Sequence, residues 1–404
     1  MRLVRADWIV TGDAEPIADG VVAVDDDGVI VDVGAAHEAR FEGAATERVR
    51  GVVMPGLVNA HTHVELSALR GRVPGGGGFL PWVERLIGAR VELDETDEAD
   101  AIASAVAEMR AAGTAAVGEV TNGLRAVAPL ARAGIAGCIF HEVFGQDLAR
   151  LRDRVRGLEA ELAERVPVWP STDLAYAPAP HTLYTLHLEV VRMIIDECRA
   201  RGRRTSLHLL EHSAERRALE SGDGPVPAWL AQRSRIEPSA LAWPKKPVVD
   251  VAADVGALSP DVVLVHLTEA RPDELARVAT AKSPVVLCPR SNLFIEGKLP
   301  PLLAMREAGL EPALGTDSLA SNVSLDLLAE ARALRDRFPT VPARELVQMA
   351  TWNGARALGL SRHGRVARGA RPGLVAIEGD LPREIADPCA WLLANLRAPR
   401  RFLA

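Results

Sequence analysis

Two of the ten histidines in this 404-residue chain, His61 and His63, are separated by one residue at the end of an apolar segment. In a β-strand, residues two apart point to the same face, so these imidazoles would converge. Imidazoles at a strand end suit a borderline cation such as zinc, which takes nitrogen ligands at about 2.0–2.1 Å. Because a metal needs three or four protein ligands, later segments must supply the others.

Four later apolar segments also end in polar residues that could bind a metal or transfer protons. Glu211 follows His208 by three residues, and His181, His266 and Asp317 come at the ends of three further segments. We interpret the remaining histidines as packing or surface residues: His37, His141, His187, His212 and His363. A carboxylate beside a metal-binding histidine is suited to general acid–base work.

The elements that must position these residues alternate regularly from residue 54 onward. Short apolar strands are followed by helical patterns in about eight repeats, which predicts a parallel sheet closed into a (β/α)8 barrel of the TIM type. The expected strands lie near 58–61, 114–117, 135–144, 174–176, 205–208, 262–265, 285–287 and 313–316. Active sites of such barrels lie at the C-terminal strand ends, where the polar residues above occur.

Both ends of the chain read differently, as short strands joined by turns. Asp25-Asp26-Asp27-Gly28 separates two alternating apolar runs, which indicates a hairpin. We therefore predict an α/β protein with a small β-sandwich domain built from residues 1–54 and 364–404, and a catalytic barrel over residues 55–363. The proline-rich segment 221–260, with Trp229 and Trp243, is long enough to be either a lid over the barrel or a surface excursion.

Composition narrows the class of protein. The chain is 48% hydrophobic and 25% charged, with a net charge of −7 and no basic stripe, so we do not expect nucleic acid as a partner. No apolar run is long enough to cross a membrane, and Asp7 and Asp13 interrupt any signal-peptide core. Four scattered cysteines without a CxxC pair fit a reducing compartment, so we expect a cytoplasmic protein. A homodimer is the default expectation.

The motifs together resemble the amidohydrolase superfamily. The resemblance rests on PGLVNAHTH around His61 and His63, on HxxE from His208 to Glu211, on His266 and on Asp317, and it covers nearly the whole chain. Within that superfamily, the chain is similar to the branch that deaminates cytosine, guanine and adenosine-type rings. His181 stands where members with two metals carry a bridging lysine, which implies one metal.

The resemblance also implies roles for these residues. One divalent ion, zinc or alternatively iron, would be held by His61, His63, His208 and Asp317, and would lower the pKa of a bound water to about 7. That water would attack the ring carbon that bears the amine, with Glu211 as general acid and base. Asp317 could also take the water proton, and His266 would either orient the water or serve as a ligand.

The loop after the first strand narrows the range of substrates that the resemblance implies. HTHVELS, a glycine run and the FLPWV segment are similar to aminodeoxyfutalosine deaminases, which implies 6-aminodeoxyfutalosine, a nucleoside of menaquinone biosynthesis, as the substrate. In that case Glu65 would hold ribose hydroxyls and Trp82 would cover the base or the tail. Arg290 or Arg70 would bind the tail carboxylate. His181 and Ser291 are further expected substrate contacts.

Other activities remain open. The nearest are deaminases of S-adenosylhomocysteine or methylthioadenosine, of guanine or of cytosine, and triazine chlorohydrolases. A cyclic amide hydrolase is a different class, which HxxE with a single metal disfavours, and a non-catalytic barrel is disfavoured by Glu211 and Asp317. The sequence Leu267-Thr268-Glu269 departs from the cysteine-containing stretch of many adenosine-type relatives.

Overall fold

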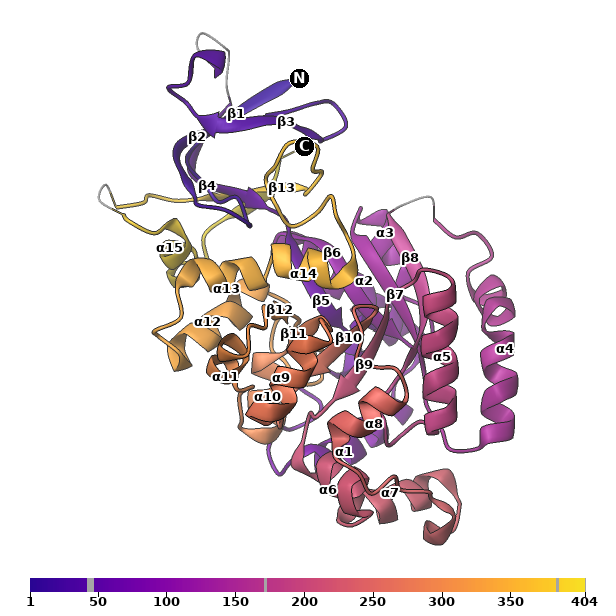
Figure 1. The fold of residues 1–404 in the computed structure, drawn as a ribbon. Coiled ribbons are helices and arrows are strands. Elements are labelled where there is room, and N and C mark those ends of the chain that lie inside the picture. The colour runs from indigo at the N-terminus through magenta and orange to yellow at the C-terminus, as the bar shows by residue number, and fades with distance from the viewer. Residues whose placement is uncertain (42–46, 171–172, 383–384, 404) are drawn as a thin grey trace.

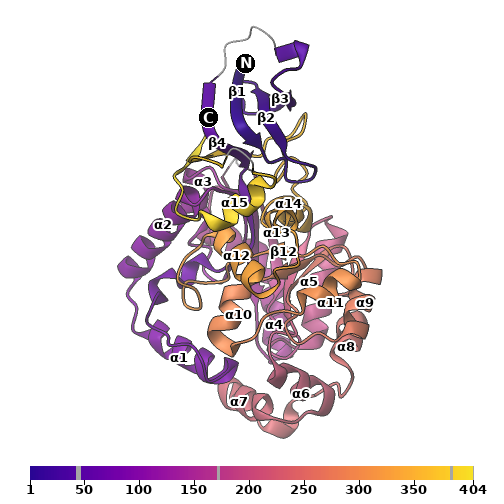
Figure 2. The same cartoon turned by 90° about the vertical axis from the view of Figure 1, so that its left-hand side faces the viewer.

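The protein, described here by a computed structural model for residues 1–41, 47–170, 173–382 and 385–403, has two parts. A barrel of strands and helices occupies one part, and a sheet formed by both chain ends lies at one end of it (Figures 1 and 2). This arrangement confirms the predicted α/β class, with a barrel and a terminal β domain. The domain boundaries at residues 54 and 364 stay a prediction.

The described residues contain eight parallel strands in the barrel. They form two four-stranded sheets, in the orders β5-β6-β7-β8 and β12-β11-β10-β9. Their bounds are β5 (Leu57–Thr62), β6 (Thr114–Thr121), β7 (Ala136–Val143), β8 (Leu174–Pro180), β9 (Thr205–Leu209), β10 (Val262–His266), β11 (Val285–Leu287) and β12 (Ala313–Leu314). Nearly every residue in these strands is buried, as expected where one face meets the barrel interior and the other meets helices.

The two sheets join at two seams that lie beside the histidines. At the first seam, the backbone N–H of Asp317 donates to the carbonyl of His61 at 3.1 Å. The Asn59 side chain donates to the Thr316 hydroxyl and accepts from the Thr316 backbone N–H. Gly315 permits this approach, because a Cβ there would lie 2.6 Å from the His61 carbonyl oxygen. At the second seam, the N–H of His208 donates to the carbonyl of His181 at 3.0 Å, which closes the barrel.

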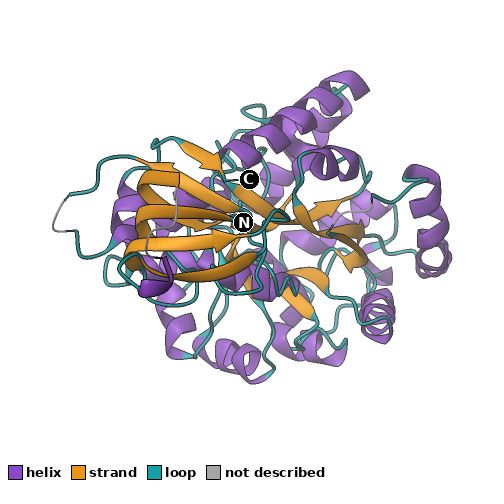
Figure 3. Cartoon of the chain, turned by 90° about the horizontal axis from the view of Figure 1, so that it is seen from above, coloured by secondary structure: helices purple, strands orange, loops and turns teal. Residues whose placement is uncertain are grey.

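Helices surround the strands when the molecule is seen from above (Figure 3). Those that follow barrel strands in the chain are α2 (Glu95–Ala111), α3 (Val127–Arg132), α4 (Leu148–Arg165), α5 (Leu188–Ala200), α8 (Val248–Asp254), α9 (Pro272–Thr280), α10 (Pro289–Glu296), α11 (Leu302–Glu307), α12 (Leu327–Arg337), α13 (Ala343–Met349) and α14 (Trp352–Leu358). Asp94 and Asp147 cap α2 and α4 by accepting from backbone N–H groups three residues on. The sequence pattern predicts these two helices at about 95–112 and 147–165, within one residue of the observed bounds.

The terminal sheet has six strands in the order β14-β13-β4-β1-β2-β3. Its strands are β1 (Arg2–Ile9), β2 (Ile17–Val24), β3 (Ile30–Ala35), β4 (Glu47–Pro55), β13 (Leu374–Glu378) and β14 (Arg400–Phe402). Alternate residues of β2 pack on opposite faces, with Val22 in one apolar cluster and Val21 in another. A short 3-10 helix, η1 (Ala39–Phe41), precedes the segment 42–46, and α15 (Pro388–Ala394) packs on the barrel core through Leu392.

A layer of helices lies at the end of the barrel away from the terminal sheet (Figures 1 and 2). It consists of η2 (Val64–Leu69), α1 (Phe79–Val91), α6 (Ser213–Ser221), α7 (Pro225–Ser234) and η3 (Pro238–Ala240). Segment 221–260, expected as a lid or an excursion, is therefore largely helical. Its Trp229 reaches the cavity described below, whereas Trp243 lines a separate cavity.

All four cysteines are buried and unpaired. Among the described residues, the search for helices with the length and apolar character of a membrane span finds none.

Candidate active site

A cavity opens at the C-terminal ends of the barrel strands, beneath α1 and α7. Its wall includes nine polar and aromatic residues that could bind a metal, bind a substrate or transfer protons: His63, Trp82, Arg90, Glu142, His181, His208, Glu211, His266 and Asp317. Residues from six different strand ends therefore meet at one place, as the barrel fold requires.

The side chains of His63 and His208 come together at the inner end of this cavity. Their Nε2 atoms lie 3.3 Å apart, and Asp317 Oδ1 lies 3.8 Å from His63 Nε2. Two nitrogen ligands at about 2.0–2.1 Å from a tetrahedral ion lie roughly 3.3 Å apart, so this spacing fits a shared metal. Buried His61, whose two ring nitrogens have no hydrogen-bond partner among the described residues, belongs to the same group.

The protonation state of these histidines suits metal binding. Burial lowers the pKa of His63 and of His208 to about 4, and it lowers the pKa of His61 well below its ordinary value. The rings are therefore neutral near pH 7, and a neutral imidazole has a nitrogen lone pair to offer. The four residues expected as ligands, His61, His63, His208 and Asp317, fit a divalent metal.

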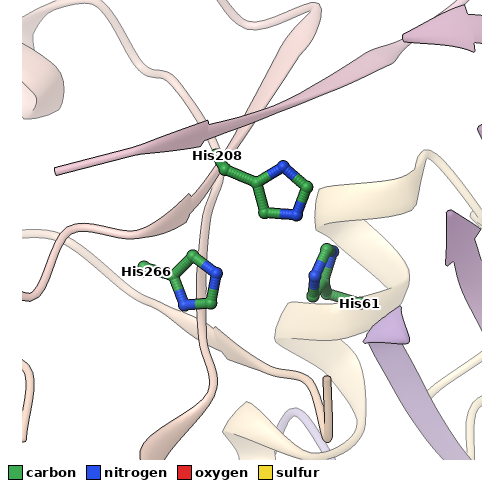
Figure 4. A group of neighbouring side chains, drawn as sticks. All are labelled: His61, His208 and His266. Carbon is green, nitrogen blue, oxygen red and sulfur yellow. The ribbon is translucent and has the colours of Figure 1, made fainter. Parts of the chain in front are cut away.

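His266 lies on the other side of this group. Its ring points toward those of His61 and His208 (Figure 4), and one nitrogen of each of the three lies within 4.8 Å of the others. His266 Nε2 is 3.7 Å from Glu211 Oε1. This position is consistent with both roles expected for His266, as a ligand or as a group that orients water.

The backbone near the site is strained at four non-glycine residues. The φ angles are 53° at Leu210, 79° at His266, 50° at Leu267 and 55° at Asp317. Such angles cost free energy in L-residues and persist where surrounding contacts enforce them, which happens often in active sites.

Glu211 is buried, and its pKa is raised well above the ordinary value, first by burial and then by the charge of Asp317. Glu215, which the sequence analysis did not single out, holds the turn before α6. Its carboxylate accepts hydrogen bonds of 3.0 Å from the N–H groups of both Leu210 and Glu211. His212 caps the same helix and stacks on Phe79, so it has the packing role expected for it.

Ser291 differs from its expected role as a substrate contact. It is fully buried, and its hydroxyl donates to Asp317 Oδ2 at 2.6 Å. Because Pro289 begins α10 directly after β11, the next residues turn inward behind the cavity wall. Ser291 therefore positions Asp317.

The contacts of Glu65 also differ from the contact with ribose that we expected. Its carboxylate accepts from the backbone N–H groups of Asn122, Gly123 and Arg125 at 2.7–3.1 Å and from the Thr121 hydroxyl. A carboxylate has about four acceptor positions, so this one is filled. Glu65 borders the cavity, yet its bonds hold the loop that follows β6.

The two arginines expected to bind a carboxylate lie outside the cavity wall. Arg70 pairs with Glu108, and Arg290 donates to Ser324 at 2.9 Å and lies 3.9 Å from Glu330. Instead the wall contains Arg90, which makes no ion pair or side-chain hydrogen bond with any described residue. Sequence analysis missed Arg90.

Arg90 belongs to one face of α1. Phe79, Trp82, Val83 and Leu86 line the cavity from the same face, at the spacing of a helix. Trp82 thus lies on the wall as expected, and its indole N–H is buried without a partner among the described residues. The spacing of these apolar residues is the sequence signal that could have predicted α1 and its orientation.

His181 lines the cavity as expected, and a chain of hydroxyls favours one of its tautomers. Thr182 Oγ1 accepts from the N–H groups of Tyr184 and Thr185, so its own hydrogen is free for Thr185 Oγ1 at 2.8 Å. The Thr185 hydroxyl then finds an acceptor in His181 Nδ1 at 2.6 Å. In this arrangement His181 presents Nε2–H to the cavity as a donor.

Comparison with known proteins places this site in a family. The model described as "Amidohydrolase family" matches residues 52–398. The chain is 30% identical over 372 residues to an aminodeoxyfutalosine deaminase of Deinococcus radiodurans, covering 89% of this chain and 86% of the relative. It is 32% identical over 382 residues to a 5-methylthioadenosine/S-adenosylhomocysteine deaminase of Halobacterium salinarum, covering 91% and 81%.

The fold agrees with these relatives. The crystal structure of Helicobacter pylori aminofutalosine deaminase in complex with methylthio-coformycin superimposes with a TM-score of 0.86 and 25% identity, over 98% of this chain and 96% of that one. The chain therefore belongs to the amidohydrolase family and is a hydrolase acting on carbon–nitrogen bonds.

Proposed function

We propose that this enzyme is a metal-dependent hydrolytic deaminase of an aminated purine nucleoside, and that its substrate is 6-aminodeoxyfutalosine. The observation that carries the proposal is a buried carboxyl group, Glu211, beside the metal-binding group. The same cavity also contains Arg90, which has no ion-pair partner among the described residues. The activity class, deamination, is inferred from the similarity to the deaminases named above.

The metal in this proposal is one divalent ion, and we expect zinc because its usual ligands are imidazole nitrogens and carboxylate oxygens. His61, His63, His208 and Asp317 would hold it. When bound, the ion supplies a water with a pKa near 7, which is a nucleophile at neutral pH.

Glu211 would handle the protons of the reaction. Burial and the charge of Asp317 raise its pKa, which favours the protonated carboxyl that could give a proton to the ring nitrogen next to the carbon that bears the amine. The leaving ammonia needs a second proton, which the Glu211 carboxylate could take from the attacking water and pass on. His266, 3.7 Å from Glu211, would orient the attacking water, and His181 Nε2–H would donate to the substrate ring.

Arg90 supports the choice of a carboxylated nucleoside. The tail of aminodeoxyfutalosine ends in a benzoate, which needs an apolar wall and a cation. The α1 face offers Phe79, Trp82 and Leu86 together with Arg90. An arginine can bind a carboxylate through two parallel charged hydrogen bonds.

A second candidate is deamination of S-adenosylhomocysteine or methylthioadenosine. The Halobacterium salinarum relative favours it, and S-adenosylhomocysteine also carries a carboxylate that Arg90 could bind. A cytoplasmic location and a homodimer stay predictions.

The test is ammonia release by the metal-loaded enzyme from a panel of substrates: aminodeoxyfutalosine, S-adenosylhomocysteine, methylthioadenosine, adenosine, guanine and cytosine. We expect the highest kcat/KM for aminodeoxyfutalosine. A higher value for either sulfur nucleoside would establish the second candidate, and activity on free bases alone would reject both.

A further inference from the structure

Glu142, next to last in β7, is a buried acid that neither the sequence motifs nor the proposed reaction uses. It is 5% exposed and lines the cavity. Its Oε2 accepts from Asn122 Nδ2 at 3.2 Å, but its Oε1 has no hydrogen-bond partner among the described residues. Because a buried acceptor without a partner is costly, this oxygen calls for a donor from the cavity.

The two nearest histidines do not supply that donor. His208 Nδ1 lies 3.7 Å from Glu142 Oε1, but this nitrogen already bonds to the His181 carbonyl at 3.0 Å. His181 Nε2 is 3.9 Å from Glu142 Oε1, which is beyond hydrogen-bond distance.

A second cation held by Glu142, His181 and His208 is also disfavoured. The other nitrogen of His208 faces His63 in the metal group, so both ring nitrogens are in use. The described residues therefore leave this buried oxygen for a ligand of another kind.

The wall presents an acceptor and a donor side by side at this point. Glu142 Oε1 can only accept from its ligand while ionised, and His181 Nε2–H can only donate. A nucleoside matches both, because its sugar hydroxyls donate and the neighbouring purine ring nitrogen accepts. A free base lacks the hydroxyl.

We propose that Glu142 accepts a hydrogen bond from a ribose hydroxyl of the substrate and so selects nucleosides over their deoxy analogues. Asn122 holds the carboxylate in place for this contact. The inference rests on the proposed nucleoside deamination, and it assigns to Glu142 the contact that Glu65, with its acceptor positions filled, does not make.

Glu142→Gln is the informative variant. The amide oxygen would stay toward Asn122 Nδ2, so the NH2 group would face the cavity and replace an acceptor by a donor. Glu311→Gln is the control, since it removes one exposed negative charge, paired with Arg356, that lies off the cavity wall.

The experiment measures kcat/KM of the metal-loaded enzymes for adenosine, 2′-deoxyadenosine and 3′-deoxyadenosine. The parent should disfavour at least one deoxy analogue by roughly ten- to hundredfold, the range of a charged hydrogen bond. In Glu142→Gln this preference should shrink to within about threefold at unchanged metal content, while Glu311→Gln should keep the parental preference.

Three results would overturn the inference alone. The first is an equal loss on all three nucleosides in Glu142→Gln, which would make Glu142 a positioning residue. The second is loss of metal from that variant. The third is a parent enzyme that distinguishes none of the three nucleosides. A parent that deaminates no nucleoside would reject the proposed function as well, so the two failures are distinguishable.

Discussion

The Ser291 hydroxyl donates to Asp317 Oδ2 at 2.6 Å and leaves Oδ1 of the same carboxylate facing His63. Hydrogen bonds behind a metal ligand orient it, and losing one weakens metal binding by about 10–100-fold. Ser291→Ala should therefore lower metal affinity by that factor, measured by competition with a chelator. Ser324→Ala, which removes only a partner of Arg290, is the control and should leave the affinity unchanged.

Metal content gives a second prediction. The His61, His63, His208 and Asp317 group fits one ion, so purified enzyme should contain about one equivalent by elemental analysis. His63→Ala should retain much less, because it removes a ligand from the 3.3 Å pair. Two equivalents in the parent enzyme would contradict the prediction.

Glu211→Gln tests the proton transfers. The amide cannot give or take a proton, so kcat/KM should fall by at least about 10²–10⁴-fold. Metal content should stay near that of the parent, since Glu211 is not among the proposed ligands. A loss of only a few-fold would show that another group carries the protons.

Arg90→Ala tests recognition of the substrate tail. A charged hydrogen bond contributes about 1.5–3 kcal/mol, or roughly ten- to hundredfold in kcat/KM toward aminodeoxyfutalosine. Turnover of adenosine, which has no carboxylate, should change little. Arg70→Ala is the matched control, because Arg70 pairs with Glu108 off the cavity wall. An equal loss on both substrates in Arg90→Ala would exclude Arg90 as the carboxylate-binding residue.

Glu65→Gln should destabilise the protein. Its NH2 group would oppose backbone N–H donors of residues 122–125, which should cost about 1.5–3 kcal/mol or more of unfolding free energy. Thermal unfolding of the metal-loaded protein followed by circular dichroism measures this as a lower Tm. Glu311→Gln removes an exposed ion pair with Arg356 and should change stability by less than about 1 kcal/mol. Equal effects of the two substitutions would show that the Glu65 contacts add no stability.

The barrel could be predicted from the sequence because its signals are local. Each strand is a short apolar run, and a chemically active residue such as His61, His208 or His266 ends it. Barrel geometry then brings the strand ends together without any knowledge of side-chain contacts.

The substrate-binding residues could not be predicted in the same way, since their contacts are distant in sequence. Glu65 binds a loop 57 to 60 residues later, and Arg70 pairs with Glu108 on another helix. Residue type and spacing do not reveal such partners. Glu142 directly follows His141, a core residue that bonds to Tyr176, and no sequence motif distinguishes it.

The seam between β5 and β12 has a consequence for how the protein is made. Thr62, between the two histidines of the first strand, pairs with Asp317, which is translated 255 residues later. At a synthesis rate of about 5–20 residues per second, the histidine pair waits roughly 13–50 s on the ribosome before its carboxylate partner exists. During that interval the nascent chain offers an incomplete set of metal ligands. We therefore expect the metal to be selected only after Asp317 has been synthesised.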